Sequence, residues 1–527
     1  MRKLLTLIII GLGLNLSLKA QNPFWSNVSY KGAFPVSDGT TSTDWTYNWS
    51  NFDPENTNYP STTSTLSSDI TTNTTISGTV LLQNKVYVTN GATLTILPGT
   101  IIRGDKSTQS TLIITKGCKI IAEGTQNSPI VFTSNESVGN RAEGDWGGLV
   151  ILGQATNNQP GGVANIEGIV PTANTQFGGS DDNDNSGSLK YVRVEFGGIA
   201  LEPNKEINGI TFGSVGRATQ VDYIQVSFSG DDSYEWFGGT VDCKHLIAYR
   251  GIDDDFDTDF GYRGRIQFGL IIRDNTMYDA AGDSNGLESD NDAAGSANTP
   301  QTAAIFSNLT IIGAKGNGSI TLPTGEKFEK AFRIRRNSSI SVFNSLVVGW
   351  EKGLSIEGAS CEKNVTSGTL VFSNNVLTEL PLGASYVTAT TGFFSPIALV
   401  NDTTTSVNQI KWVNAFPSLG MTPDCRLDST SSVSTGADFT NAKFVGGFVS
   451  VNEVTKTTNV SIYPNPATNN VNITTDKLVQ VTLIDGMGRV ISTQTVSGTL
   501  SLDVSTLNNG IYFLQVDNTT KKIIIRK

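Results

Sequence analysis

The sequence predicts an all-β chain in which short parallel strands stack into a long coil. Three consecutive segments each carry a β-rich run that leads into a turn with aspartates: 221–232, 242–255 and 266–274. Aligning Tyr223, His245 and Phe268 places the segments 22 and 23 residues apart. A repeat of this length is typical of a solenoid, because one lap cannot bury its own apolar face and must stack on its neighbour.

The same pattern continues on both sides of these segments. The residues taken as equivalent, from the first lap to the last, are Tyr191, Tyr223, His245, Phe268, Phe306, Phe343 and Phe372. The shortest spacing is a bare lap, and the longer ones predict insertions at turns, chiefly 154–188 and 274–300. Stacked strands lie about 4.8 Å apart, so equivalent side chains form ladders and distant residues share one edge.

Composition agrees with turn-rich β structure and excludes one class of partner. Charged residues make up 16% of the 527, below the roughly 25% of an average globular chain. The formal net charge of −11 excludes nucleic-acid binding, since phosphate contacts need a basic surface. Cations and neutral or basic partners fit this charge better.

The first 20 residues have the pattern of a signal peptide. Met1, Arg2 and Lys3 precede a mostly apolar run from Leu4 to Leu18, which is followed by Lys19-Ala20-Gln21. A membrane anchor is the alternative, but the run is too short to span a bilayer comfortably. We therefore expect export, with no transmembrane segment after signal removal.

Residues 21–80 are rich in Trp, Thr, Ser and Asn. We interpret this segment as an N-terminal cap whose aromatic side chains close the open end of the coil, which would otherwise expose strand edges. An aromatic platform for sugar binding is the alternative.

The coil itself is expected over 81–448. Alternating apolar residues broken by glycines indicate short strands and tight corners in the segments 91–104, 111–125, 129–134 and 144–153. These segments resemble the opening laps of right-handed parallel β-helix proteins. The resemblance implies the fold but no activity, because that fold carries lyases, hydrolases, adhesins and inert stalks.

The residue pattern changes after a linker at 449–459. Alternating apolar residues with Gly and Asn turns predict a small antiparallel β-sandwich over 460–527. Tyr463-Pro-Asn-Pro, Asp485-Gly-Met-Gly-Arg, Gly510-Ile-Tyr-Phe and the basic terminal strand resemble the C-terminal sorting domain of the type IX (Por) secretion system. The resemblance implies a Bacteroidetes-type outer membrane, secretion machinery as a partner, and release or attachment at the cell surface. A carbohydrate-binding sandwich is the alternative.

One stretch of the coil is strongly acidic. Residues 231–292 contain fifteen acidic and five basic side chains. Stacked laps would bring carboxylates together, where they repel one another unless a cation intervenes. Oxygen ligands of this kind suit Ca²⁺, although the run is not an EF-hand. The candidate metal ligands are Asp231, Asp232, Asp253, Asp254, Asp255, Asp257 and Asp259.

Two alternatives to a calcium site stay open. The aspartates can instead cap turns and pair with Arg250 and Arg273, which fall at equivalent positions. The edge can also be catalytic, with Arg250, Arg273 or Lys244 as weak candidates for a lyase base, or with Asp231, Asp232, Asp254 and Asp255 as the carboxylates of a glycosidase.

Histidine chemistry is largely excluded, because His245 is the only histidine and it occupies a ladder position. A Ser-His-Asp triad and a His-based zinc site are therefore not expected. The four cysteines permit two disulfides, and isolated buried thiols are the alternative.

These observations predict a secreted or cell-surface adhesin or glycan-binding protein with a Ca²⁺-binding acidic edge. The alternatives are a Ca²⁺-dependent polysaccharide lyase or glycoside hydrolase, and a plain surface stalk.

Overall fold

The chain forms two compact units, Met1–Val445 and Gly446–Lys527, in the computed structural model. The structure describes residues 23–202, 205–279, 284–317, 320, 322, 328, 330–380, 386–388, 400–418, 420–444, 461–485, 489–516 and 519–527. The expected signal peptide (1–20) and linker (449–459) lie outside these residues. No helix in these ranges is both long and apolar enough to cross a membrane.

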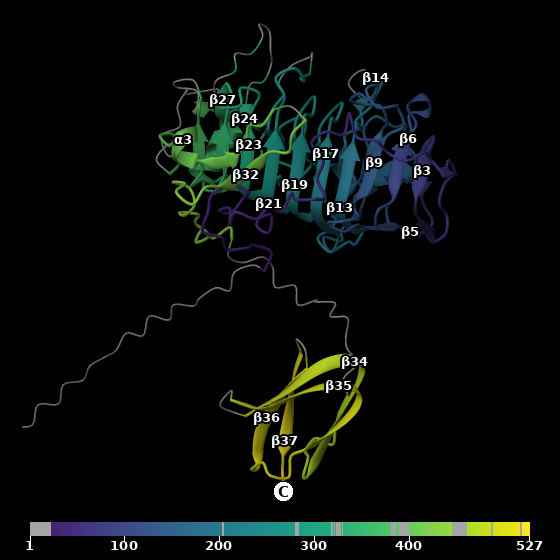
Figure 1. Ribbon diagram of the computed structural model, residues 1–527, viewed down its shortest axis with the longest axis vertical. Coiled ribbons are helices and arrows are strands. Elements are labelled where there is room, and N and C mark those ends of the chain that lie inside the picture. Colours follow the sequence, from purple (N-terminus) through teal and green to yellow (C-terminus); the bar gives the residue numbers. More distant parts are fainter. Residues whose placement is uncertain are drawn as a thin grey trace, which may run out of the picture. The chain divides into compact units, whose positions relative to one another are not determined.

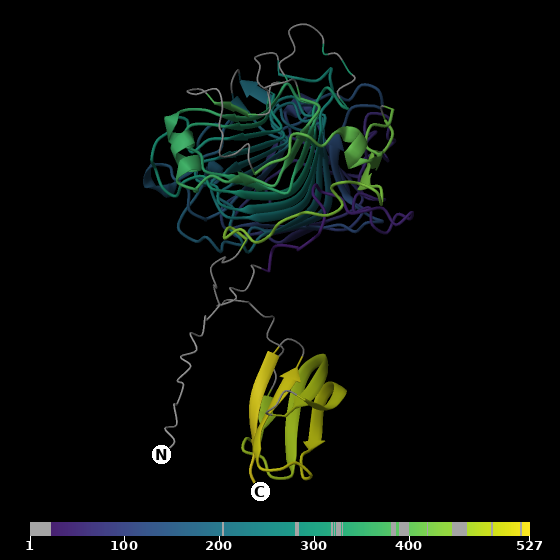
Figure 2. The same ribbon diagram turned by 90° about the vertical axis from the view of Figure 1, so that its left-hand side faces the viewer.

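The first unit is a parallel β-helix built on two long sheets, which confirms the predicted fold class. Figures 1 and 2 show the strands stacked along the coil. Sheet 1 contains β1 (Ser64–Leu66), β2 (Thr74–Ile76), β3 (Thr79–Leu82), β5 (Thr93–Ile96), β6 (Ile101–Gly104), β8 (Lys119–Glu123), β9 (Ile130–Ser134), β13 (Gly187–Glu195), β17 (Gln220–Ser227), β19 (Asp242–Tyr249), β21 (Arg265–Ile272), β23 (Ile305–Ile312), β25 (Ser341–Phe343), β26 (Leu346–Val348), β28 (Phe372–Ser373) and β29 (Val376–Thr378).

Sheet 2 lies across the core from sheet 1. It contains β4 (Lys85–Val88), β7 (Thr111–Ile114), β10 (Gly148–Leu152), β16 (Ile210–Gly213), β18 (Tyr234–Phe237), β20 (Phe256–Asp259), β22 (Leu287–Ser289), β24 (Lys330–Ile334), β27 (Lys352–Ile356) and β30 (Tyr386–Thr388). Every pairing within the two sheets is parallel, for example Tyr234 with Phe256 and Phe256 with Leu287. Alternate side chains of each strand point inward, and the inward side chains form a continuous apolar core.

Smaller elements decorate the coil. They are the hairpins β11 (Ala164–Asn165) with β12 (Gln176–Phe177), β14 (Ala200–Glu202) with β15 (Lys205–Glu206), and β31 (Trp412–Asn414) with β32 (Asp424–Leu427); the helices α1 (Ala359–Thr366) and α3 (Val407–Ile410); and the 3-10 turns η1 (Lys106–Thr108), η2 (Pro160–Gly162) and η3 (Ala173–Thr175).

The long strands of sheet 1 bend at one residue with left-handed backbone. Tyr191, Tyr223, His245 and Phe268 occupy this position, with φ of 49°, 57°, 50° and 66°. Their rings stack with centroids 4.5, 4.3 and 5.1 Å apart. The alignment of these four residues is therefore confirmed.

The alignment predicted for the next three laps is wrong. Phe306 pairs with Ile266 in the core, Phe343 with Ser307 and Phe372 with Val342. The bend is occupied instead by Asn308, Asn344 and Asn374, with φ of 57°, 54° and 63°. Asparagine tolerates the left-handed backbone of the bend. Aromatic residues do not favour this backbone conformation, and in the earlier laps they are stabilised at the bend by stacking of their rings.

The N-terminal segment does not gather at one end of the coil, as a cap would. It crosses the outer face of sheet 1 and is held there by amide side chains that bond its backbone in both directions. Asn51 N–H donates to Gln225 Oε1 (2.8 Å) and Gln225 Nε2 donates to Asn51 O (2.7 Å). Ser26 and Gln267 make the same pair of bonds, both 2.9 Å. Parallel strands begin at Ser64, inside the segment 21–80 for which the sequence predicts a cap.

The aromatic residues of this segment are used for packing. Trp49 is fully buried against the edges of Tyr191 and Tyr223, with centroids 5.8 and 6.1 Å away. Trp45 packs on His245 at 5.2 Å. These contacts leave the two rings no open face for the sugar platform considered as an alternative.

The insertion 154–188 covers part of the outer face of sheet 2. Ile166 and Phe177 pack there on Val150, Leu152 and Phe237, which point away from the core. The early strands of sheet 2 are therefore apolar on both faces, whereas the later ones turn polar side chains outward.

The second unit is a five-stranded antiparallel sheet. It contains β33 (Ser461–Tyr463), β34 (Asn470–Ile484), β35 (Val490–Asp503), β36 (Gly510–Val516) and β37 (Thr519–Ile525). Its apolar side chains form a core of their own.

All four cysteines are free and buried: Cys118, Cys243, Cys361 and Cys425. The alternative of isolated thiols holds in this structure.

Candidate metal centre

The candidate site lies on the outward face of sheet 2. Glu235 in β18 pairs in register with Asp257 in β20, and Asp257 with Glu288 in β22. Their neighbours Trp236, Phe256 and Leu287 lie in the core, so the three carboxylates point the other way. Arg333 in β24 follows Glu288 in the same row. The sheet therefore presents three acidic side chains on three adjacent strands.

The turns that precede these strands bring further carboxylates to the row. Carboxylate oxygens of Asp232, Glu235 and Asp257 all lie within 4.8 Å of one another. A second group, Asp231, Asp232 and Asp253, meets the same limit and shares Asp232. As expected from the stacking, consecutive acidic turns lie side by side, and Asp254 N–H donates to Asp232 Oδ1 (2.9 Å).

Two buried oxygen atoms at this place lack donors. Asp257 Oδ1 is buried, and no described residue donates a hydrogen bond to it. The same holds for Oδ1 of Asn208, whose side chain is 3% exposed and whose Nδ2 donates to Glu235 and, at 3.3 Å, to Thr211 Oγ1. A buried oxygen without a partner costs about 1–3 kcal/mol. A bound cation would remove this penalty.

The grouped carboxyls have raised pKa values. Burial raises the pKa of Asp232, and the neighbouring Asp231 raises it further. Burial does the same for Glu235 and for Asp257, where Glu235 and Glu288 add to the effect. The pKa of Asp253 rises to about 8, mainly through burial and then through Asp231. A nearby cation would oppose this rise, because it favours the ionised carboxylates.

Within the described part of the chain, no lysine or arginine forms an ion pair with Asp232, Glu235 or Asp257. This separates them from Asp255, Glu288 and Asp290, which pair with arginines.

Asp255 is one such compensated carboxylate. Its Oδ2 lies 2.7 Å from Arg273 Nε, and both side chains are 0% exposed. Arg273 also donates to the backbone carbonyls of Gly251, Ile252, Asp253 and Asn285. Arg273 therefore holds the acidic turn together from below and does not reach the outward row.

Asp254 and Asp259 serve the backbone. Asp254 Oδ1 accepts from Asn285 N–H at 2.6 Å, and Asp259 Oδ1 from Phe260 N–H at 2.6 Å. Burial nevertheless raises the pKa of each to about 8. Turn capping or ion pairing thus accounts for Asp254, Asp255 and Asp259. Asp232 also accepts a backbone N–H, and it belongs with Asp231, Asp253 and Asp257 to the groups of carboxylates that remain candidate metal ligands.

The candidate lyase bases do not face the row of carboxylates. Arg250 pairs with Glu55 (2.9 Å) and Asp274 (3.0 Å), and its guanidinium lies over the ring of Phe228. Lys244 lies in sheet 1, where its Nζ donates to Ser26 Oγ (3.0 Å). Together with the ion-paired Arg273, this removes the geometric support for all three as bases at the acidic face.

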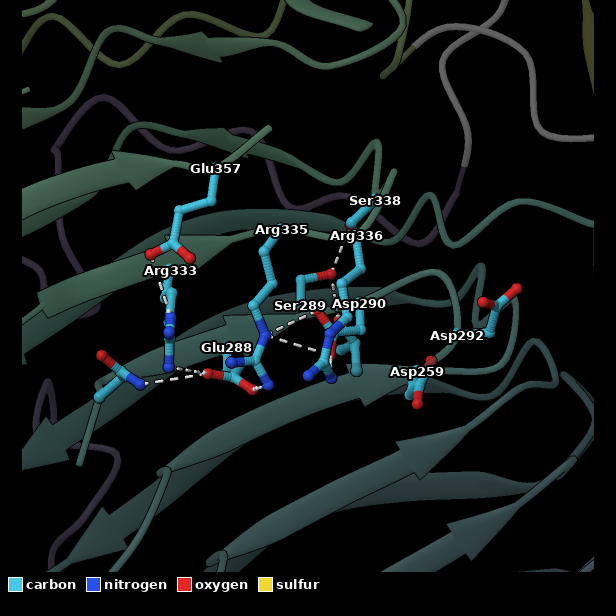
Figure 3. A network of polar contacts seen from close by, with 12 residues as sticks. Asp259, Glu288, Ser289, Asp290, Asp292, Arg333, Arg335, Arg336, Ser338 and Glu357 are labelled. Atoms are coloured by element: carbon cyan, nitrogen blue, oxygen red, sulfur yellow. Dashed lines mark hydrogen bonds and ion pairs between the residues drawn. The ribbon is translucent and has the colours of Figure 1, made fainter. Parts of the chain in front are cut away.

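Three arginines close the other end of the row (Figure 3). Arg333 contacts Glu288 (3.2 Å) and Glu357 (3.1 Å), and Arg335 pairs with Glu288 and, at 2.9 Å, with Asp290. Arg336 reaches Asp290 at 2.6 Å. The pKa of Glu288 is still raised to about 8, because burial outweighs these cations. The outward face is therefore acidic at β18 and β20 and balanced at β22 and β24.

The donor set suits a hard divalent cation. Carboxylates and an amide oxygen are the ligands that Ca²⁺ takes, whereas zinc prefers Cys and His, which are absent from this set. Glu235 and Asn208 were missed from the sequence. The signal for Glu235 was its place in register with Asp257, as a single charge in the buried strand Tyr234–Phe237.

Two family models match this chain. The family model described as pectate-lyase like beta helix domain matches residues 64–416, and the secretion system C-terminal sorting domain matches residues 461–527. A search of curated proteins finds no match. Among solved structures, the Dettilon tailspike protein (gp208) is similar at 10% identity and a TM-score of 0.23, over 60% of this chain and 62% of the tailspike chain.

The sorting domain indicates export through the type IX secretion system, to the cell surface or the extracellular space. Two thirds of the chain match the β-helix family. The protein is thus an exported member of the pectate-lyase-like β-helix family with a C-terminal type IX sorting domain.

Proposed function

We propose that this exported protein binds extracellular glycan through a calcium ion held by Asp232, Glu235 and Asp257. The observation that carries the proposal is the meeting of three carboxylates within 4.8 Å, without an ion-pair partner among the described residues. The two buried oxygens without donors, Asp257 Oδ1 and Asn208 Oδ1, add support.

The charge of the site favours a divalent cation over a proton alone. Three carboxylates carry three negative charges, and mutual repulsion prevents all three from ionising together. Ca²⁺ binds about six to eight oxygens, so these residues would leave positions for water or for ligand oxygens. Sugar hydroxyls and carboxylates are oxygen donors of this kind. Calcium would also neutralise a face that otherwise repels an acidic polysaccharide.

A calcium-dependent melting experiment tests the ion. An ion bound only to the folded protein stabilises it, by about 2.7 kcal/mol at a hundred times its dissociation constant. We expect calcium to raise the melting temperature of the unmodified protein, and Glu235→Gln and Asp257→Asn each to abolish most of this rise. The exposed Glu143→Gln is the matched control and should behave as the unmodified protein.

A glycan array, with and without chelator, tests the partner. We expect binding of at least one polysaccharide class that disappears on chelation and in Asp257→Asn. Equal melting with and without calcium would reject the ion, and glycan binding unaffected by chelator would reject its role.

Glycoside hydrolysis is the second candidate, because Glu235 and Asp257 combine close approach with raised pKa values. A protonated and an ionised carboxyl about 5 Å apart can act as general acid and nucleophile in a retaining glycosidase. Release of reducing ends from a bound polysaccharide, lost in Glu235→Gln, would establish this activity. Binding without any product would exclude it for that polysaccharide.

A further inference from the structure

A second candidate site lies away from the acidic face, where the chain after the last laps packs back on the coil. Two adjoining hollows of about 350 and 670 Å³ share Ala415 and Phe416 in their walls. We name them together the Phe416 trough. Pockets of about 300–1,000 Å³ are the size that holds small organic ligands.

The larger hollow is lined by α3, by β31 and by residues that follow β32, whereas the smaller one is lined mainly by the ends of β19, β21 and β23 and the turns after them. Trp412 and Phe416 face each other edge to face, with ring centroids 5.6 Å apart. A Cβ built on Gly316 would come within 3.8 Å of Phe416 Cδ1, so the ring lies directly over the backbone of that turn. Both rings are partly exposed; Phe416 lines both hollows and Trp412 lines the larger one. This contrasts with Trp49 of the N-terminal segment, which is completely buried.

The trough is lined by charged groups of both signs. In the smaller hollow, Arg250 and Asp274 form an ion pair at 3.0 Å. In the larger hollow, Lys411 Nζ donates to Thr430 Oγ1 at 2.8 Å, and Asp428 lies in the same wall. Asn408 and Asn414 are exposed at its edge. Three cations and two carboxylates line the trough, and the third cation, Arg273, is paired with Asp255 behind the wall. The lining therefore has little uncompensated charge, and it offers donors and acceptors to a neutral ligand.

We propose that the Phe416 trough binds a short stretch of neutral polysaccharide, independently of calcium. A sugar ring has an apolar face of C–H groups that can lie on an aromatic ring, and hydroxyls at its edge that amides and carboxylates can bond. The trough supplies both: the rings of Trp412 and Phe416, and the side chains of Asn408, Asn414 and Asp428. This site extends beyond the calcium proposal and does not depend on it.

One residue links the smaller hollow to the acidic turns. Arg273 lines the smaller hollow, and the same guanidinium pairs with Asp255 beneath the acidic turn. The two sites nevertheless differ in chemistry. The metal centre needs a cation and suits ligands with acidic or clustered oxygens, whereas the trough suits uncharged ligands.

The experiment measures binding of neutral gluco-, xylo- and manno-oligosaccharides of four to six units by calorimetry, in chelator. We expect at least one to bind, and Trp412→Ala and Asn414→Ala each to weaken binding roughly tenfold or more, which is about 1.4 kcal/mol. Because Trp412 also packs on the core, Trp412→Phe tests the ring with less disturbance, and the exposed Asn414 tests the site without touching the core. Tyr47→Ala, an exposed aromatic outside the trough, is the control.

Three results would overturn the proposal. They are no binding of any oligosaccharide in the panel, binding that Trp412→Phe and Asn414→Ala leave unchanged, and binding that requires calcium. The last result, if also lost in Asp257→Asn, would support the metal centre instead. Conversely, calcium-independent binding that Asp257→Asn does not affect would uphold the trough even if the metal centre bound no ion.

Discussion

Calcium binding at the metal centre should release protons and should become tighter as pH rises. Asp232, Glu235 and Asp257 have raised pKa values because they are buried close together, and Asp253 reaches about 8. Carboxyls with raised pKa values retain protons more readily in the empty site, and a divalent cation must displace the protons that they hold. Each displaced proton makes the affinity about tenfold higher per pH unit, or about 1.4 kcal/mol.

The arrangement of the site sets the expected size of this effect. Three carboxylates within 4.8 Å cannot all be ionised without a cation. We therefore expect roughly one to two protons released per ion at about pH 6, and a rise in affinity of roughly ten- to a hundredfold between about pH 6 and pH 7.

Titration calorimetry in two buffers with different heats of ionisation measures the proton release directly. Glu235→Gln removes one of the titrating groups and should reduce both the affinity and the number of protons released. Affinity that does not change with pH, together with equal heats in the two buffers, would refute the assignment of these carboxyls as ligands.

Three further predictions concern stability. First, the calcium-free protein should lose stability as pH rises from about 4 to 8, because in this range Asp253 keeps a proton in the folded protein and has lost it in the unfolded chain. The free energy of unfolding should fall by about 1.4 kcal/mol per pH unit for each such group. A melting temperature that does not change with pH would contradict this. Second, Arg273→Met should lower the free energy of unfolding, measured by chemical denaturation, by about 3–5 kcal/mol, because it leaves Asp255 buried and unpaired. The control Lys244→Met should lower it by about 1 kcal/mol or less. Similar losses in the two variants would refute this role of Arg273. Third, Gln267→Ala removes two hydrogen bonds to the backbone of Ser26, which together contribute about 2 kcal/mol, and should speed amide hydrogen exchange at Ser26 roughly thirtyfold. The control Gln83→Ala lies outside the N-terminal segment and should leave this exchange unchanged. Unchanged exchange in Gln267→Ala would contradict the role of Gln267 in holding the segment.

The sequence was most informative for the laps that carry no insertion. Tyr223, His245 and Phe268 differ only by single laps, so their alignment could be predicted and with it the neighbourhood of Asp232 and Asp254. In the longer laps that follow, the aromatic residues could not be aligned correctly from the sequence. Asn308 replaces the aromatic residue at the bend, and a phenylalanine two positions earlier belongs to the core.

The sequence predicted that the acidic turns lie side by side, but not which other residues contact each aspartate. Runs of aspartate indicated the edge, yet whether each aspartate is a free ligand depends on partners in other laps. Arg273, which compensates Asp255, is such a partner. Glu235 lies in an apolar strand and gave no local signal, and only the register of β18 and β20 brings it beside Asp257.

The N-terminal segment could not be placed from the sequence. Its contacts join residues such as Ser26 and Gln267, which are 241 positions apart. An amide side chain that bonds a distant backbone leaves no periodic pattern, so the aromatic composition of the segment was interpreted as a cap.

X-ray diffraction from crystals soaked in calcium tests the central claim most directly. An anomalous difference peak about 2.3–2.6 Å from carboxylate oxygens of Asp232, Glu235 and Asp257, the usual length of a calcium–oxygen contact, is the predicted result. Crystals that show no peak at these side chains in saturating calcium, with the carboxyls bonded to one another or to water, would contradict the claim.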